Sequence, residues 1–174
     1  MILIEPTTEY CRQIQAYRKE FLDSGDSMDG TDGLRRIEDP EEWIGRSRSG
    51  KDPATAPAGL VPATQFIFVR EEDEKIVGML QIRHCFNDYL EKFGGHIGYS
   101  VAPSERRKGY ATEMLKAALP KCRELGLDKV LITCIDHNVG SRKTILANGG
   151  IYESTVYEPD EKVNLERYWI DLSK

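Results

Sequence analysis

The sequence predicts an α/β fold in which helices flank a mixed sheet. Runs rich in β-branched and aromatic residues alternate with stretches of helical periodicity, and charged or glycine-rich turns separate them. From residue 96 the predicted order is strand, helix, strand, helix, strand, strand, which is typical of the α/β class. The 174 residues are 40% hydrophobic and 30% charged, enough for one buried core, so we expect residues 1–174 to form a single domain.

The first part of the chain predicts a short strand and two helices. "MILIE" is the strand, and "TTEYCRQIQAYRKEFLDS" carries aromatic and aliphatic residues at helical spacing. Residues 23–33, "DSGDSMDGTDG", predict an exposed loop because glycine and aspartate favour turns. "DPEEWIGRS" predicts a second helix, since its proline and glutamates suit a first helical turn. The proline-rich "SGKDPATAPAGLVPAT" predicts another loop.

Strands predominate from residue 64. "TQFIFVR" and "KIVGMLQIRHC" flank the charged "EEDE", which indicates an antiparallel hairpin, and "HIGYSV" is a third strand. A helical face then runs from Ala111 to Leu125, ends at Gly126, and contains Pro120, which predicts a kink or an early end. "KVLITCI" predicts a buried strand, "GSRKTILANGG" a short helix, and "IYESTVY" with "LERYWIDL" a final pair of strands.

Charge and composition exclude several classes of protein. The net charge of -5 argues against non-specific nucleic-acid binding, and no apolar run approaches a membrane span. The N-terminus lacks the cationic start and long apolar core of a signal peptide. The four cysteines are scattered without a C-x-x-C pair, which argues against a disulfide scaffold or a zinc site. We therefore expect a cytoplasmic protein with reduced thiols, no metal, and neither a nucleic-acid nor a membrane partner.

The turn "APSERRKGY" concentrates positive charge in an acidic chain. A strand that enters a tight turn at the start of a helix leaves backbone N–H groups at the positive end of the helix dipole, where anions bind. Arg106, Arg107 and Lys108 add charge there, and Gly109 permits close approach of a phosphate. A solvated cationic turn is the alternative. The spacing of a nucleotide triphosphate loop is absent.

"SVAPSERRKGYATEML" resembles the signature of the GNAT N-acyltransferase superfamily. In that family an Arg/Gln-x-x-Gly-x-Gly/Ala element after a strand binds the pyrophosphate of acetyl-CoA, and Arg106, Gly109 and Ala111 fill its positions. "DHNVGSRKTILANGGI" is similar to the family's Asn-x-x-Ser helix, with Asn138 and Ser141 in register. The likeness spans roughly residues 64–172, and "FGGHIGYSVAPSERRKGYA" further resembles a bacterial subgroup of predicted acetyltransferases.

This resemblance implies an enzyme that moves an acetyl group from acetyl-CoA directly to a primary amine. It also implies a GNAT-like, mostly antiparallel mixed sheet whose central strand splays from its neighbour to form an acyl-CoA cleft. The alternative is a non-catalytic acyl-CoA-binding or regulatory module. The implied cofactor-binding residues lie on the central strand, the cationic turn and the later helix: Tyr99, Ser100, Val101, Arg106, Arg107, Lys108, Gly109, Tyr110, Ala111, Thr112, Asn138 and Ser141.

The catalytic acid and base are less well defined by the sequence. Many members of the family place a proton-donating tyrosine where this chain has Leu146, so Tyr152, Tyr157 or water would have to protonate the thiolate. His96 is the first candidate base because a neutral imidazole accepts a proton near pH 7. Its alternative role is structural, as a histidine hydrogen-bonded at a strand end.

The sequence leaves the acceptor and the oligomeric state open. The acceptor is a small-molecule amine or a protein amine, and a homodimer is one option for the assembly. Four aspartates recur at every third residue of the acidic segment: Asp23, Asp26, Asp29 and Asp32. A solvated loop is the simplest interpretation, steering of a cationic amine is the other, and the spacing of a calcium-binding loop is missing.

Overall fold

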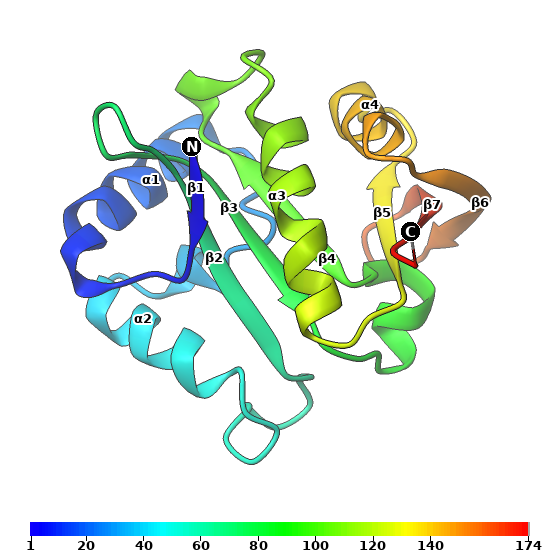
Figure 1. Cartoon of the computed structure of the whole chain (residues 1–174), viewed down its shortest axis with the longest axis horizontal. Helices are drawn as coiled ribbons and strands as arrows, with labels where there is room; N and C mark the ends of the chain where they lie inside the picture. The colour runs from blue at the N-terminus through cyan, green and yellow to red at the C-terminus, as the bar shows by residue number, and fades with distance from the viewer. Residues whose placement is uncertain (174) are drawn as a thin grey trace.

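The computed structural model describes residues 1–173 and contains seven strands and four longer helices (Figure 1). The strands are β1 (Ile2–Ile4), β2 (Ala63–Arg70), β3 (Lys75–Arg83), β4 (Ile97–Val101), β5 (Lys129–Ile135), β6 (Ile151–Glu158) and β7 (Val163–Asp171). The helices are α1 (Cys11–Ser24), α2 (Pro40–Ser49), α3 (Tyr110–Glu124) and α4 (Val139–Ala147). Four short helical turns accompany them: η1 (Thr8–Tyr10), η2 (Leu34–Arg36), η3 (Leu90–Gly94) and η4 (Pro103–Glu105).

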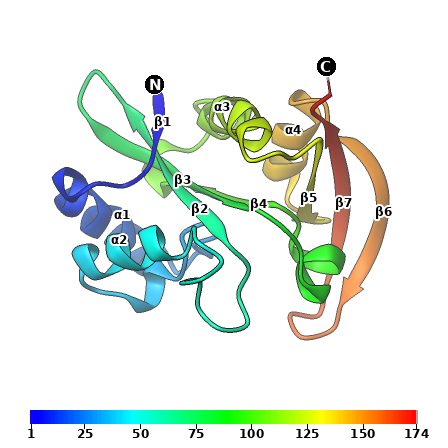
Figure 2. The same ribbon diagram turned by 60° about the horizontal axis from the view of Figure 1, so that its bottom comes forward.

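The strands form two antiparallel sheets. One sheet has the order β1-β2-β3-β4 and the other the order β5-β7-β6, so β4 and β5 are edge strands. Figure 2 shows the two sheets side by side, with β4 of the first sheet next to β5 of the second. The expected mostly antiparallel sheet flanked by helices is confirmed, but it is divided in two between β4 and β5.

Two hydrogen bonds of His96, one from its backbone and one to its ring, join the two sheets just before β4 begins. The His96 N–H donates to the Leu131 carbonyl at 2.8 Å, and the Leu131 N–H donates to His96 Nδ1 at 2.9 Å. A Cβ on Gly95 would lie 2.5 Å from the Leu131 carbonyl oxygen, so only glycine allows this approach. No ladder pairs β4 with β5 anywhere in residues 1–173, so the strands separate beyond this junction, as expected of a splayed central strand.

Helices cover both faces of the first sheet. In Figure 2, α3 and α4 lie on one side, and α1 and α2 lie on the other side of β1–β4. The α3 side has its own core, which includes Leu80, Met114 and Leu115, and the α1–α2 side is built around Ile14 and Trp43. All five of these residues are fully buried. This burial of apolar surface is the main force that holds the helices on the sheet.

The segment 25–33 docks on the first sheet and is not the wholly exposed loop that its composition predicts. Its backbone carbonyls accept three side-chain hydrogen bonds, from Trp43 Nε1 to Thr31 (2.7 Å), from Gln65 Nε2 to Gly30 (2.8 Å) and from Ser100 Oγ to Asp29 (2.7 Å). Thr31 itself is 3% exposed. The donors come from three distant parts of the chain, so local composition carried no sign of this docking.

Helix α3 continues through Pro120 to Glu124, so the predicted early end is wrong. A proline removes one N–H and leaves the carbonyl four residues earlier without its helical partner. That carbonyl belongs to Lys116, and both Lys116 and Pro120 are exposed, so water can bond to it.

Substitutions at Gly30 and Gly33 test whether the docked segment must lie close to β4. A Cβ at Gly30 would lie 2.1 Å from the Gly98 carbonyl oxygen, whereas one at Gly33 would meet nothing within 4 Å, although both glycines have positive φ (67° and 78°). Gly33→Ala should therefore cost only the left-handed strain of about 1–2 kcal/mol. Gly30→Ala should cost at least about 2 kcal/mol more, because backbone must move. Equal unfolding free energies of the two variants in urea would contradict this docking.

Candidate functional site

The free edge of β4 presents backbone groups toward the opening between the sheets. The Arg83 N–H bonds to the His96 carbonyl and the Ala102 N–H to the Val77 carbonyl, which fixes the phase of the β3–β4 ladder. Because antiparallel residues bond alternately to opposite neighbours, the residues at 97, 99 and 101 turn their N–H groups away from β3. These groups point into the opening that the splay leaves beside β5.

The turn after β4 forms a row of free backbone donors. In the described chain, the N–H groups of residues 107–111 have no hydrogen-bond partner, and the first intrahelical bonds come from the N–H groups of Thr112 and Glu113 to Gly109. Arg107 (φ 63°) and Gly109 (φ 86°) both adopt the left-handed conformation that curls such a turn. Consecutive free N–H groups at the start of a helix form a site for phosphate groups.

The three cations of this turn differ in their surroundings. Arg106 Nη1 pairs with Asp26 at 2.6 Å, and Lys108 Nζ pairs with Glu105 at 2.8 Å. Arg107 is exposed and has no ion pair in the part of the chain that the structure describes. Arg107 is therefore the cation most available to an anion, while Arg106 connects the turn to the docked segment 25–33.

Glu105 anchors the turn to the first sheet. Its side chain is 5% exposed and contacts three cations: Lys75 at 2.6 Å, Lys108 at 2.8 Å and Arg70 at 2.9 Å. The hydrogen bonds from Lys108 and Lys75 lower the pKa of Glu105 to about 2. Arg70 also donates to the Tyr110 hydroxyl at 3.1 Å, so this cluster holds both ends of the turn.

The α4 side of the opening is connected to β4 by two hydroxyl groups. Asn138 Oδ1 accepts from the Ser141 N–H at 3.0 Å and caps α4, as the predicted Asn-x-x-Ser element requires. The Ser141 hydroxyl lies 2.8 Å from the Tyr99 hydroxyl. Burial raises the pKa of Tyr99 to about 12, so this phenol keeps its proton near neutral pH.

The remaining predicted cofactor residues lie on the two faces of β4 and in the first turn of α3. Tyr99 and Val101 pack against the α3-side core, as alternation predicts. The Ser100 side chain lies on the opposite face, 3.1 Å from the Tyr17 hydroxyl, and so is not on the side of α3 and α4. Ala111 and Thr112 lie in the first turn of α3, and the Thr112 carbonyl accepts from Asn148 Nδ2 at 3.2 Å.

His96 occupies the junction of the sheets, and its geometry does not favour the predicted role of base. Nδ1 accepts the Leu131 N–H, so the ring proton sits on Nε2 and neither nitrogen is free to accept a proton. The ring stacks on Phe86 at 4.0 Å between centroids, and the residue is 6% exposed. Burial lowers the pKa of His96 to about 4.

The structure does not bring the two predicted tyrosine acids to the opening. Tyr152 and Tyr157 lie on β6, the outer strand, and β7 separates them from β5. They are 53% and 58% exposed, and the Tyr152 hydroxyl pairs with Thr155 at 2.9 Å. Leu146, at the position of the family's usual tyrosine, is 49% exposed.

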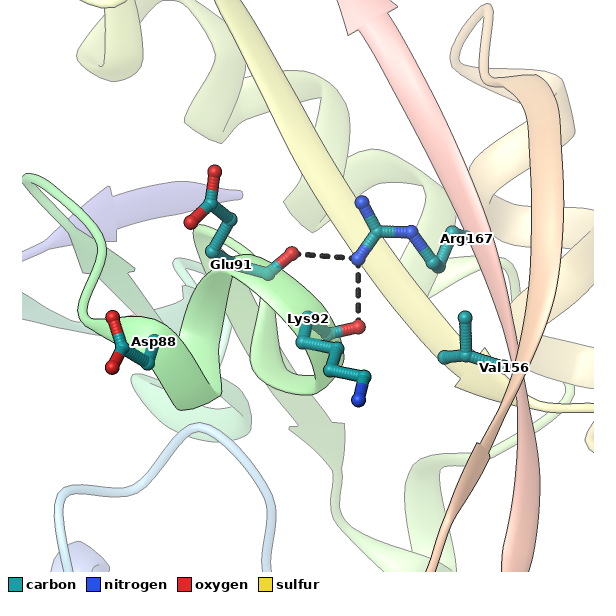
Figure 3. A pocket seen from close by; sticks show the side chains of 5 residues that line it. All are labelled: Asp88, Glu91, Lys92, Val156 and Arg167. Atoms are coloured by element: carbon teal, nitrogen blue, oxygen red, sulfur yellow. Dashed lines mark hydrogen bonds between the residues drawn. The ribbon is translucent and has the colours of Figure 1, made fainter.

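Two hollows flank η3 on the side of β4 that faces away from α3. One, of about 410 Å³, lies between η3 and the β6–β7 pair and is lined by Asp88, Glu91, Lys92, Val156 and Arg167 (Figure 3). Arg167 Nη1 donates to the carbonyls of Glu91 and Lys92 at 2.6 and 2.7 Å, and thus fixes η3 against β7.

The second hollow, of about 510 Å³, lies under the segment 28–33 and reaches β3 and the chain before η3. Arg83 and Gly30 line it, and both lie against Gly98 of β4. Sequence reasoning missed Arg83, Glu105 and Tyr17, since an isolated charge in a strand or a helical tyrosine has no local pattern that marks it.

Residues 33–149 match the acetyltransferase (GNAT) family. The match spans more than half of the chain, so the protein belongs to this family, as the motif resemblance predicted. The predicted class of enzyme, an acetyltransferase with acetyl-CoA as its donor, is confirmed at this level. A search of curated protein sequences finds no match.

Several solved structures share the fold of this chain. Mycobacterium smegmatis RimJ in complex with CoA-disulfide has a TM-score of 0.70 and 20% identity over 97% of this chain and 80% of that chain. The ribosomal-protein-S5-alanine acetyltransferase from Vibrio fischeri has a TM-score of 0.72 and 17% identity over 99% and 93%. A mutant of spermidine N-acetyltransferase SpeG from Vibrio cholerae has a TM-score of 0.66 and 14% identity over 100% and 96%.

Neither a metal centre nor a membrane helix is found in residues 1–173. No cluster of three or more His, Cys, Asp or Glu side chains is arranged to hold a metal ion in this range. None of its helices is both long and apolar enough to cross a membrane.

The free N–H groups of the turn can be tested at Gly109. Gly109 (φ 86°) and Gly126 (φ 80°) flank the two ends of α3, and a Cβ at either would meet nothing within 4 Å. Gly109→Val and Gly126→Val should therefore be strained to a similar degree. Only Gly109→Val should weaken acetyl-CoA binding, at least about tenfold by calorimetry, because it reorients the donors. Equal affinity in the two variants would remove this turn from the binding site.

The Glu105 cluster predicts a specific loss of stability in acid. Because the folded-state pKa of about 2 lies below the ordinary 4.5, the stabilisation is complete above pH 4.5 and is lost as pH falls toward 2. Glu105→Gln should lower the unfolding free energy at pH 7 and flatten its decline between pH 4.5 and 2. Glu124→Gln is the control, because Glu124 is 64% exposed. If the unfolding free energy of Glu105→Gln declined between pH 4.5 and 2 as steeply as that of the wild type, the cluster would add no stability.

Proposed function

We propose that this protein transfers the acetyl group of acetyl-CoA directly to a primary amine. The observation that carries the proposal is the run of free N–H groups at residues 107–111, placed where the free edge of β4 ends. This arrangement supports a cofactor whose phosphates bind the turn and whose arm follows β4 into the opening. Tyr99 and Val101 would then lie beside the acetyl group.

The free backbone groups of β4 supply the electrostatic part of the proposed reaction. A β4 N–H that points into the opening can donate to the thioester carbonyl and stabilise the oxyanion that forms when the amine attacks. Held in this position, the thioester reacts with an amine delivered from the other side of the strand. The C–N bond forms in this attack, and the C–S bond breaks when the oxyanion collapses to the amide. The amine gives its proton to solvent water, and the thiolate takes a proton from solvent.

The pair of hydroxyl groups of Tyr99 and Ser141 is the proposed partner of the leaving sulfur. The two groups lie 2.8 Å apart and connect β4 with α4 across the opening. A thiolate is a good leaving group near neutral pH, so a hydrogen bond to the sulfur is enough to assist its departure without proton transfer from the protein. The raised pKa of Tyr99 keeps its hydroxyl protonated for that purpose. This assignment replaces Tyr152 and Tyr157, which lie on the outer strand.

The proposed mechanism leaves the amine proton to solvent and assigns His96 a structural role. His96→Ala should lower the unfolding free energy by about 2–3 kcal/mol, because it removes a buried ring and the Leu131 hydrogen bond. Activity per folded molecule should stay within about threefold of wild type. His137→Ala is the control, because that side chain is 79% exposed. A loss of about 10²-fold in kcat/KM at unchanged stability would make His96 the base.

The experiment that tests the function is release of free CoA from acetyl-CoA with a panel of primary amines. Turnover supports the enzyme, whereas acetyl-CoA binding without turnover across the panel supports a non-catalytic module. The similar structures are named for acetylation of spermidine or of ribosomal proteins, so the panel should hold small amines and peptide N-termini.

The four cysteines are free thiols, which supports the proposed cytoplasmic location.

A further inference from the structure

Arg83 is a half-buried cation that forms no ion pair in the described chain, although the charge of the Asp29 carboxylate acts on it. Its Nη1 donates to the carbonyls of Gly94 and Gly95 at 3.0 and 3.1 Å, and no carboxylate pairs with it within residues 1–173. Nε and Nη2 have no protein partner, so one edge of the guanidinium, with two adjacent donors, is unoccupied. Burial lowers the pKa of Arg83, and an anion at that edge would offset the lost hydration.

Arg83 lines the 510 Å³ hollow, and its Nη2 lies beside β4. Nη2 is 3.2 Å from the position that a Cβ on Gly98 would occupy, and Gly98 precedes Tyr99 on β4. Gly98 and Ser100 share the face of β4 that turns away from α3 and α4, opposite Tyr99. An acceptor in this hollow would therefore approach the thioester from the side opposite the cofactor arm.

The other charges near the hollow do not favour a polycation. Within the acidic segment, Asp23 pairs with Lys19, Asp26 with Arg106 and Asp32 with Arg46, which leaves only Asp29 without an ion pair. Three of the four carboxylates that could steer a cationic amine are therefore already paired with cations of the protein. Arg36 and the unpaired Asp29 line the same hollow as Arg83, so its charges without an ion pair are two positive and one negative.

We infer that the acceptor is a small primary amine that also carries a carboxylate, and that Arg83 binds this carboxylate through its Nε and Nη2 edge. A planar guanidinium edge matches the two oxygens of a carboxylate, and such a paired hydrogen bond is strong and directional. The volume of about 510 Å³ suits a small molecule of the size of an amino acid. This inference rests on the proposed N-acetyltransfer.

The test compares pairs of acceptors with and without a carboxylate, and includes a polycation and a phosphate-bearing amine as alternatives. Release of CoA from acetyl-CoA is measured with the standard L-α-amino acids, with the carboxamide of each, with spermidine, and with phosphoethanolamine against ethanolamine. At least one free amino acid should be acetylated with a kcat/KM at least about tenfold above that of its amide. Arg83→Gln should bring that ratio close to one through KM, and Arg83→Lys should retain part of it.

Controls separate recognition from folding and from the proposed function. Arg83→Gln should keep the wild-type affinity for acetyl-CoA, and Arg12→Gln, at an exposed position of α1, should leave the acid-to-amide ratio unchanged. The wild-type ratio alone decides the inference if Arg83→Gln fails to fold. Equal rates for acids and amides, or preference for spermidine or phosphoethanolamine, would overturn it while leaving N-acetyltransfer in place. No release with any amine would overturn both.

Discussion

The two hydrogen bonds between His96 and Leu131 are the constraint on which the rest of the site depends. They join the edges of the two antiparallel sheets just before β4, and no ladder between β4 and β5 continues beyond them in residues 1–173. An edge strand with unpaired N–H groups normally invites another strand. Here the opening keeps β5 away, so the donors of β4 are free for a ligand. The proposed binding surface of β4 thus exists because the hydrogen bonding between the two sheets ends at this junction.

Charge neutralisation organises the surroundings of this opening. Glu105 holds the cofactor turn to the first sheet through three cations, and Arg106 ties the same turn to Asp26 of the docked segment. A buried carboxylate is stable only when such partners offset its desolvation. As a result, most of the charge that stands out in the sequence maintains the geometry of the turn, and Arg107 alone of its three cations stays unpaired in the described chain.

In the proposed mechanism, the alternation of β4 places the two substrates on opposite sides of one strand. Tyr99 faces α3 and α4, where its hydroxyl meets Ser141, whereas Gly98 and Ser100 face the docked segment and the hollow that contains Arg83. The period of two residues along β4 thus gives the proposed cofactor side and the proposed acceptor side different residues of the same strand. Gly98 is suited to the second side, because it leaves room for the segment at Gly30 and for the guanidinium.

The sequence by itself determined the order of the elements, the cationic turn at the start of α3 and the capped helix α4. These features depend on neighbouring residues, such as the glycine at 109 and the Asn138 cap three residues before Ser141, so local patterns reveal them. Only the tertiary structure decided that His96 joins the sheets, that Asp26 meets Arg106, and that the segment 25–33 docks. Each of these rests on at least one contact between residues 35 or more positions apart, which no local periodicity encodes.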